Sequence, residues 1–212
     1  MPQSRLMGSH FLAAIGQGIY RLLGWRCIGA TPPYKKYVIL AAPHTSNWDA
    51  FYLLCAAAIL KLRFSYFGKN TLFHGPVGWM LRATGGLPLD RARSQGLVSQ
   101  AVRWLKDSDA FAMGVAPEGT RKYKPGWKTG FYHIAVEAGV PVVLGYIDYS
   151  KKEGGILPDV LIPTGDINKD FEFLRTRYDH CVAKHPEWKA PITPLRPERA
   201  EPPETRTEAR AT

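Results

Sequence analysis

Cysteine is scarce in this sequence, and its three copies, Cys27, Cys55 and Cys181, stand far apart. They form no C-x-x-C pair and no spacing typical of metal ligands. An odd, scattered set indicates buried or incidental thiols in a reducing compartment rather than a disulfide framework. We therefore expect no metal ion and no cofactor that depends on cysteine ligands.

Long apolar runs are also missing. The longest candidate, residues 50–60, is shorter than the roughly 18 residues that a membrane-spanning helix needs, and we interpret it as a buried helix. The N-terminus carries no signal-peptide cleavage pattern after a compact apolar region. We therefore expect a peripheral protein that lies on the cytoplasmic face of a membrane.

Acidic residues are few in the first half of the chain. Residues 1–112 hold 4 Asp and Glu against 13 Lys and Arg, whereas residues 113–189 hold 10 against 11. A basic half needs an acidic partner, which is nucleic acid or anionic lipid. No aromatic RNP strand, zinc finger or Arg/Lys-dense helix is found, so we expect anionic lipid at a membrane surface and no nucleic acid. A merely basic, soluble surface is the alternative.

The composition that is present, 45% hydrophobic and 22% charged over 212 residues, is typical of one globular domain. Apolar residues follow a helical spacing within residues 6–25, and Phe11, Tyr20 and Trp25 add the aromatic bulk found at lipid headgroups. We predict an amphipathic, membrane-docking helix within residues 1–30, with an ordinary core-covering helix as the alternative. Residues 190–212 are rich in Pro, Glu and Arg, which predicts a disordered tail.

Between these ends, residues 31–189 alternate short apolar runs with helical periods. This pattern predicts an α/β domain with a mostly parallel, twisted sheet and helices on both faces. Because Pro158 interrupts residues 156–162, we expect short edge strands there, followed by a helix over 169–184. The strands before them are expected at 37–42, 64–67, 86–89, 111–115 and 142–147, and the helices at 48–60, 72–83, 96–105 and 129–138.

Polar side chains cluster directly after the first expected strand, where α/β proteins place their sites. His44 precedes a helix that Thr45 or Ser46 can cap, and Asp49 lies in its first turn. The chain can therefore bend the imidazole and the carboxylate towards each other, which is the arrangement of a general base. The alternative is a capping aspartate beside a loop histidine.

Two further clusters follow later strands. The first, residues 85–91, ends in Arg91, whose planar guanidinium can bind a phosphate; a tight turn with a solvated Asp90–Arg91 pair is the alternative. In the second, residues 117–121, Gly119 permits a sharp bend and Arg121 is expected to face the same mouth as His44. A surface turn with a local Glu118–Arg121 contact is the alternative for this cluster.

Together these residues resemble the glycerolipid acyltransferase family, which includes lysophosphatidic acid acyltransferases. The family's H-x4-D motif matches His44 and Asp49, and its glycine-to-arginine motif matches residues 86–91. Its PEGTR motif matches residues 117–121, and its apolar-proline motif matches residues 140–142. The order and spacing agree over roughly residues 37–148.

The resemblance implies an O-acyltransferase of phospholipid biosynthesis in which His44 is the base and Asp49 is its partner. The donor is a fatty acyl thioester on coenzyme A or on acyl carrier protein, and the acceptor is a lysophospholipid such as 1-acylglycerol-3-phosphate. The resemblance places five residues at the acceptor's phosphate, namely Arg91, Glu118, Gly119, Thr120 and Arg121. A lyso-lipid with an amino-acid headgroup, a non-catalytic lipid-binding protein and a thioester hydrolase remain as alternatives.

Overall fold

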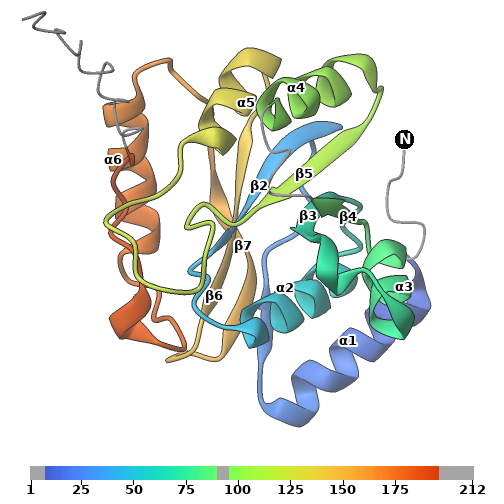
Figure 1. The fold of residues 1–212 in the computed structure, drawn as a ribbon. Coiled ribbons are helices and arrows are strands. Elements are labelled where there is room, and N and C mark those ends of the chain that lie inside the picture. Colours follow the sequence, from blue (N-terminus) through green and yellow to red (C-terminus); the bar gives the residue numbers. More distant parts are fainter. Residues whose placement is uncertain (1–7, 90–95, 196–212) are drawn as a thin grey trace, which may run out of the picture.

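A single twisted sheet crosses the molecule, with its strands in the order β1-β7-β6-β2-β5-β3-β4 (Figure 1). The computed structural model describes residues 8–89 and 96–195. Within them, neighbouring strands run parallel at every contact except that of β6 with β7. The strands are β1 Arg26–Ile28, β2 Lys36–Ala42, β3 Ser65–Lys69, β4 Gly86–Leu89, β5 Phe111–Val115, β6 Val142–Asp148 and β7 Glu153–Leu161.

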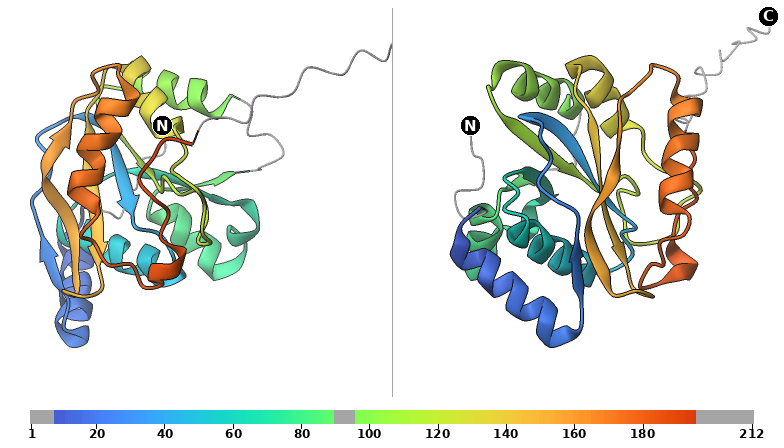
Figure 2. Two further views of the ribbon diagram at one scale, coloured as in Figure 1. Left: turned by 90° about the vertical axis from the view of Figure 1, so that its left-hand side faces the viewer. Right: turned by 180° about the vertical axis from the view of Figure 1, so that it is seen from behind.

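Helices cover both faces of this sheet, which confirms the predicted α/β class. Seen from behind, α1 and α2 lie together on one side of the sheet and α6 lies on the other (Figure 2). The helices are α1 His10–Leu23, α2 Asn47–Ile59, α3 Gly75–Ala83, α4 Leu97–Asp107, α5 Gly130–Ala138 and α6 Ile167–Tyr178, with the 3₁₀ turns η1 Asn70–Leu72 and η3 Pro186–Trp188. Among the described residues, none of these helices has the length and apolarity to cross a bilayer.

Strand β2 divides its side chains between two apolar layers. Val38 and Leu40 belong to the large core under α4, α5 and α6, whereas Tyr37 and Ile39 pack with residues of α2. A central strand buried on both faces reads as a continuous apolar run, which explains why the sequence predicts this strand clearly. The strand ends in the loop that carries His44.

The expectation of separate short strands around Pro158 is wrong, although Pro158 itself lies beyond the part of β7 that pairs with the outer strand β1. Residues 153–161 form one strand, β7, which lies inside the sheet between β1 and β6. Pro158 is tolerated because the pairing of β7 with β6 shifts register between Val143 and Gly145. On its other side β7 pairs with β1 only through residues 153–155, so no strand there requires an N–H from Pro158.

Helix α1 packs on α2, and this corrects the interpretation of two aromatic residues. Tyr20 is buried and donates a hydrogen bond to the Tyr52 carbonyl at 2.8 Å, while Trp25 is buried and stacks on the Tyr52 ring. Gly16 allows this close approach, because a Cβ there would lie 2.9 Å from the Cys55 carbonyl oxygen. Only Phe11, which is 74% exposed, is free to meet lipid in the way expected of all three aromatic residues.

The C-terminal part departs from the expected boundaries. Helix α6 ends at Tyr178, earlier than the expected 184. Residues 190–195, expected to begin a disordered tail, pack on the domain: Ala190 and Ile192 are buried, and the backbone on both sides of Pro194 bonds to Trp127. Residues 1–7 and 196–212 lie outside the described part of the chain.

Candidate active site

The loop between β2 and α2 places Asp49 by means of the helix cap. Ser46 is the N-cap residue, and its hydroxyl accepts a hydrogen bond from the Trp48 backbone N–H at 3.2 Å. Asp49 is the third residue of the helix, and its Oδ2 accepts the backbone N–H groups of Thr45 and Ser46, each at 2.6 Å. These bonds satisfy donors that a helix start leaves unpaired, so the cap itself fixes the carboxylate.

The structure brings His44 and Asp49 together. The Nδ1 atom of His44 lies 3.7 Å from Oδ2 of Asp49, which is ion-pair contact and longer than a hydrogen bond. This Nδ1 atom is buried and has no hydrogen-bond partner among the described residues. With Nδ1 turned towards the carboxylate, Nε2 at the far corner of the ring is the nitrogen that remains for a substrate.

The surroundings of His44 favour its neutral form. Burial lowers the pKa of His44, the negative charge of Asp49 opposes that effect, and the positive charge of Arg121 lowers the pKa further. A neutral imidazole can accept a proton, so His44 is held as a base at neutral pH.

Tyr149 belongs to this site, although the sequence analysis did not find it. The residue directly follows β6, and its hydroxyl donates a 2.6 Å hydrogen bond to Oδ1 of Asp49. Its position at the carboxyl end of a strand is the sequence signal that could have marked it. The Asp49 carboxylate, which is 1% exposed, thus accepts three hydrogen bonds in addition to its contact with His44.

Glu118 lies beneath the His44 loop rather than in its mouth. Its side chain is 1% exposed, and its Oε1 accepts the backbone N–H of His44 at 3.1 Å. Burial raises the pKa of Glu118 to about 7, because the His44 N–H only partly offsets the loss of water. The alternative of a surface turn with a Glu118–Arg121 contact therefore does not describe this residue, which supports the loop from below.

The rest of the third cluster reaches the surface. Gly119 adopts a φ of +65°, and a Cβ there would lie 2.8 Å from the Cδ and Cε atoms of Lys128, so the glycine admits the lysine stem. The Thr120 hydroxyl accepts the backbone N–H of Lys122 at 3.4 Å. Arg121 is exposed. This cluster therefore presents cations beside His44.

The second cluster is described only in part, because Asp90 and Arg91 lie outside the described residues. Its glycines serve the turn from α3 into β4. Gly85 adopts a φ of +96°, and a Cβ on Gly86 would lie 2.7 Å from the Leu81 carbonyl oxygen. The backbone conformation explains the glycine at position 85, and close packing explains the one at position 86.

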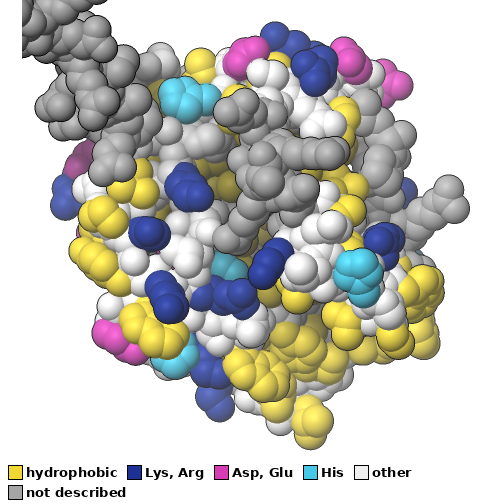
Figure 3. Space-filling model, in the orientation of Figure 1, with side chains coloured by type: hydrophobic (Ala, Val, Ile, Leu, Met, Phe, Trp, Pro, Cys, Tyr) yellow, Lys and Arg dark blue, Asp and Glu magenta, His cyan; other side chains and the backbone are white. Residues whose placement is uncertain are grey.

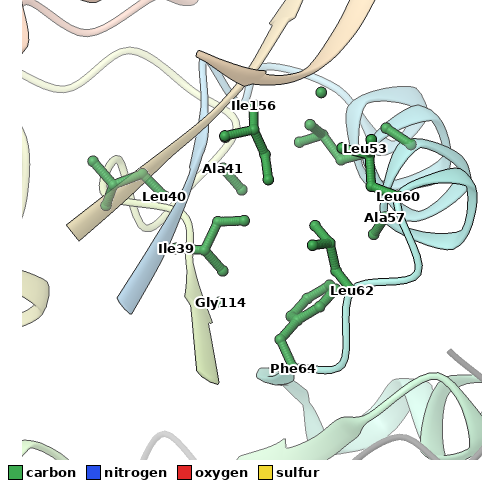
Figure 4. Close-up of a pocket in the computed structure, with 13 residues that line it drawn as sticks. Ile39, Leu40, Ala41, Leu53, Ala57, Leu60, Leu62, Phe64, Gly114 and Ile156 are labelled. Atoms are coloured by element: carbon green, nitrogen blue, oxygen red, sulfur yellow. The ribbon is translucent and has the colours of Figure 1, made fainter. Parts of the chain in front are cut away.

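An apolar pocket lies between α2 and the sheet (Figure 4). Ile39, Leu40 and Ala41 of β2 line one side, and Leu53 and Ala57 of α2 face them. The pocket is completed by side chains of the segment after α2 and by neighbouring strands, including Leu60, Leu62, Phe64, Gly114 and Ile156. Its lining suits a hydrocarbon chain.

The face that carries the site combines cations with apolar surface. Lys and Arg side chains gather around the middle of this face, and a broad apolar patch lies below and beside them, where Figure 1 places α1, α2 and α3 (Figure 3). The C-terminal segment reaches the same region: the His185 backbone N–H bonds to the Thr45 hydroxyl, and the Lys184 ammonium lies 5.1 Å from the Trp48 ring centroid. The described residues contain no His, Cys, Asp and Glu group suited to a metal ion.

Fold and site together define an α/β protein with a buried histidine–carboxylate pair at the carboxyl end of a central strand in a mostly parallel sheet. The chain belongs to the Acyltransferase family, whose model matches residues 26–146.

Relatives of known name agree with this family. The chain is 29% identical over 59% of its length to the 1-acyl-sn-glycerol-3-phosphate acyltransferase of Haemophilus influenzae, and 27% identical over 68% to the enzyme of that name from Escherichia coli. It spans 55% and 63% of the lengths of these two relatives. The crystal structure of the 1-acyl-sn-glycerophosphate acyltransferase of Thermotoga maritima shares the fold, with a TM-score of 0.53 and 18% identity over 80% of this chain and 74% of that one.

Proposed function

We propose that this protein transfers a fatty acyl group from a thioester to the free hydroxyl of a lysophospholipid, with 1-acylglycerol-3-phosphate as the acceptor. The observation that carries the proposal is His44, whose neutral form burial favours, held against the buried Asp49 in the loop that follows β2. The names of the relatives suggest the acceptor. The reaction would belong to phospholipid biosynthesis.

The chemistry follows from the geometry of the base. Nε2 of His44 takes the proton of the acceptor hydroxyl while that oxygen attacks the thioester carbonyl. The tetrahedral species then collapses to the ester, and the thiolate leaves with the proton that the imidazolium returns. Asp49 stabilises the imidazolium between these two steps, because its carboxylate lies 3.7 Å from Nδ1. The proposed route uses no covalent acyl-enzyme intermediate and no metal ion.

The acyl chain has an apolar place to lie beside this base. Ala41 at the end of β2 lines the pocket, and His44 follows it by three residues. A thioester carbonyl at Nε2 of His44 can therefore continue into hydrocarbon contacts with α2. The basic surface beside the site suits either donor, coenzyme A with its phosphates or an acidic acyl carrier protein.

An assay with purified protein tests the function. With acyl-CoA or acyl carrier protein as donor, thiol release should depend on added 1-acylglycerol-3-phosphate and should yield the diacyl product. Release of thiol without any acceptor would indicate a thioester hydrolase. Transfer only to a lyso-lipid with an amino-acid headgroup would show that this lipid, and not 1-acylglycerol-3-phosphate, is the acceptor. Absence of turnover with either donor and all acceptors, together with lysolipid binding, would identify a non-catalytic lipid-binding protein.

Arg121→Ala is expected to raise the Michaelis constant for a phosphate-bearing acceptor by on the order of tenfold, with a smaller effect for the acyl donor. A charge-assisted contact to phosphate is worth roughly 1.5–3 kcal/mol, and the guanidinium fork supplies it better than an ammonium group. Arg121→Lys should therefore rescue only part of the effect. Steady-state kinetics with varied acceptor measure it.

The matched control is Arg175→Ala, because Arg175 is an exposed arginine on α6 whose guanidinium pairs with Glu172. Arg91→Ala completes the test of the hypothesis that Arg91 and Arg121 together bind the acceptor's phosphate, which we call the phosphate clamp. Acceptor constants that stay unchanged in both Arg91 and Arg121 variants would refute the clamp and favour an acceptor without phosphate.

We also propose that the protein binds an anionic membrane surface through the apolar patch of Figure 3. Exposed large side chains on three helices support it, namely Phe11 and Leu22 of α1, Trp48 and Phe51 of α2, and Val77, Trp79 and Met80 of α3. An apolar face beside cations is the pattern of a protein that lies on anionic lipid. The proposed location is thus peripheral, on the cytoplasmic face of a membrane.

Trp79→Ser should weaken binding to vesicles of phosphatidylcholine and phosphatidylglycerol by roughly tenfold, because burying a large apolar side chain is worth roughly 1.5–3 kcal/mol. Co-sedimentation measures the binding. Ile162→Ser is the control: Ile162 is similarly exposed, at 60% against 69%, but follows β7 beside the start of β6, at the sheet edge opposite His44. Equal loss in both variants, or none in either, would contradict docking through this patch.

A further inference from the structure

Three hydrogen bonds hold the Asp49 carboxylate, and only one of them comes from a side chain. Oδ2 accepts the backbone N–H groups of Thr45 and Ser46, and Oδ1 accepts the hydroxyl of Tyr149, all at 2.6 Å. The two backbone bonds belong to the helix cap and exist wherever an acidic residue caps a helix in this way. The bond from Tyr149 joins the residue after β6 to the first turn of α2 across 100 positions of sequence, and a cap does not require it.

We propose that Tyr149 is a positioning residue for the reaction, which fixes the orientation of Asp49 and sets how strongly that carboxylate attracts a proton to His44. The inference rests on the proposed function, in which His44 is the base. Tyr149 does not contact the substrate in this proposal, and it acts on the reaction only through Asp49.

The aromatic ring of Tyr149 is held so that its hydroxyl can serve only this purpose. It packs edge-on against Trp25 at 5.1 Å and against Tyr52 at 6.1 Å between ring centroids. The backbone N–H of Tyr149 bonds to the Val182 carbonyl at 2.9 Å, which fixes the start of the turn after β6. A side chain held at both its backbone and its ring delivers the hydroxyl to Oδ1 with little loss of rotamer entropy.

The hydroxyl remains a donor across the working range of pH. Burial raises the pKa of Tyr149 well above its ordinary value, and the hydrogen bond to Asp49 and the charge of that carboxylate raise it further. A protonated phenol facing a carboxylate stabilises the negative charge on Asp49. That charge raises the pKa of His44. The Tyr149 hydroxyl disperses the negative charge of Asp49. It therefore reduces the extent to which that charge raises the pKa of His44.

Two effects of Tyr149→Phe follow. The carboxylate loses a bond that fixes its plane, so kcat should fall by about tenfold with little change in either Michaelis constant. The undispersed charge on Asp49 should raise the pKa of His44. The acid limb of the pH–rate profile should therefore move to higher pH, because the active neutral imidazole is lost earlier as the pH falls.

The experiment measures the titration of His44 by NMR in the wild type and in Tyr149→Phe, alongside steady-state kinetics and thermal unfolding. The control is Tyr20→Phe: the Tyr20 hydroxyl belongs to the same aromatic cluster but bonds to the Tyr52 backbone carbonyl. This control should lose stability without shifting the His44 titration. The double variant Asp49→Asn/Tyr149→Phe should be no slower than Asp49→Asn alone, because both changes act through one carboxylate.

An upward shift of the His44 titration in Tyr149→Phe and not in Tyr20→Phe, with coupling in the double variant, supports the inference. An unchanged titration with unchanged kcat, or rate losses that simply multiply in the double variant, would overturn it. The histidine titration needs no turnover. If the wild-type protein transferred no acyl group to any acceptor, the proposed function would fail while the link from Tyr149 to His44 could still be measured.

Discussion

His44→Ala is expected to reduce acyl transfer by on the order of 10²–10⁴-fold and to leave the fold intact. The loss is large because neither carboxylate beside His44 is placed to replace it: Asp49 is occupied by its three hydrogen bonds, and Glu118 lies under the loop. The fold should tolerate the change because Nδ1 of His44 is a buried atom without a hydrogen-bond partner. Its removal breaks no bond and leaves none of its neighbours unsatisfied.

The measurement is the initial rate of acyl transfer at saturating donor and acceptor, with circular dichroism to confirm the fold. His74→Ala is the matched control, because His74 is exposed and makes no side-chain cap bond at the start of α3. That variant should keep its activity. A folded His44→Ala protein that retained more than about a tenth of wild-type activity would show that His44 is not the base.

Asp49→Asn should be the second damaging change, with a rate loss on the order of 10⁴-fold, as expected when a base loses the carboxylate that stabilises its imidazolium. The structure explains why this variant should still fold. The amide oxygen can accept the N–H groups of Thr45 and Ser46, and the amide NH₂ can donate to the Tyr149 hydroxyl, which can also accept a hydrogen bond. The geometry is retained and the negative charge is lost.

A pH–rate profile separates this electrostatic role from a structural one. The charge of Asp49 raises the pKa of His44, so its removal lowers that pKa. Any residual activity of Asp49→Asn should therefore persist to lower pH than that of the wild type, since neutral imidazole survives further into acid. Wild-type activity in a folded Asp49→Asn protein would reduce Asp49 to a residue of the helix cap.

The elements that could be predicted are those whose own residues carry the signal for them. Strands β2, β5 and β6 are buried on both faces and appear as apolar runs, and α2 follows a recognisable cap. Strand β1 was not predicted, because three residues give no periodicity and its partner β7 lies more than 120 positions away. Strand β7 was placed at an edge because Pro158 normally excludes a central position, and no local pattern reveals a register shift in the neighbouring strand.

The residues of the site also differ in whether their placement depends on nearby sequence or on distant strands. His44 and Asp49 were found because five residues around a helix start determine their geometry. The burial of Glu118 was not predicted, since a carboxylate between a proline and a glycine also fits an exposed turn. It is buried because β5 lies next to β2, which puts the end of one strand under the loop of the other. Tyr149 required the neighbouring placement of β6 and β2, which a single sequence does not state.

The sheet ends on both sides in very short strands, and this bears on aggregation. The outermost strands are β1, with three residues, and β4, with four. Within β4, Pro88 has no N–H, and in β1 the exposed Arg26 pairs with Glu153. The two outermost strands themselves therefore offer few backbone groups to another chain, which opposes edge-to-edge pairing of sheets through β1 and β4 when many copies crowd together.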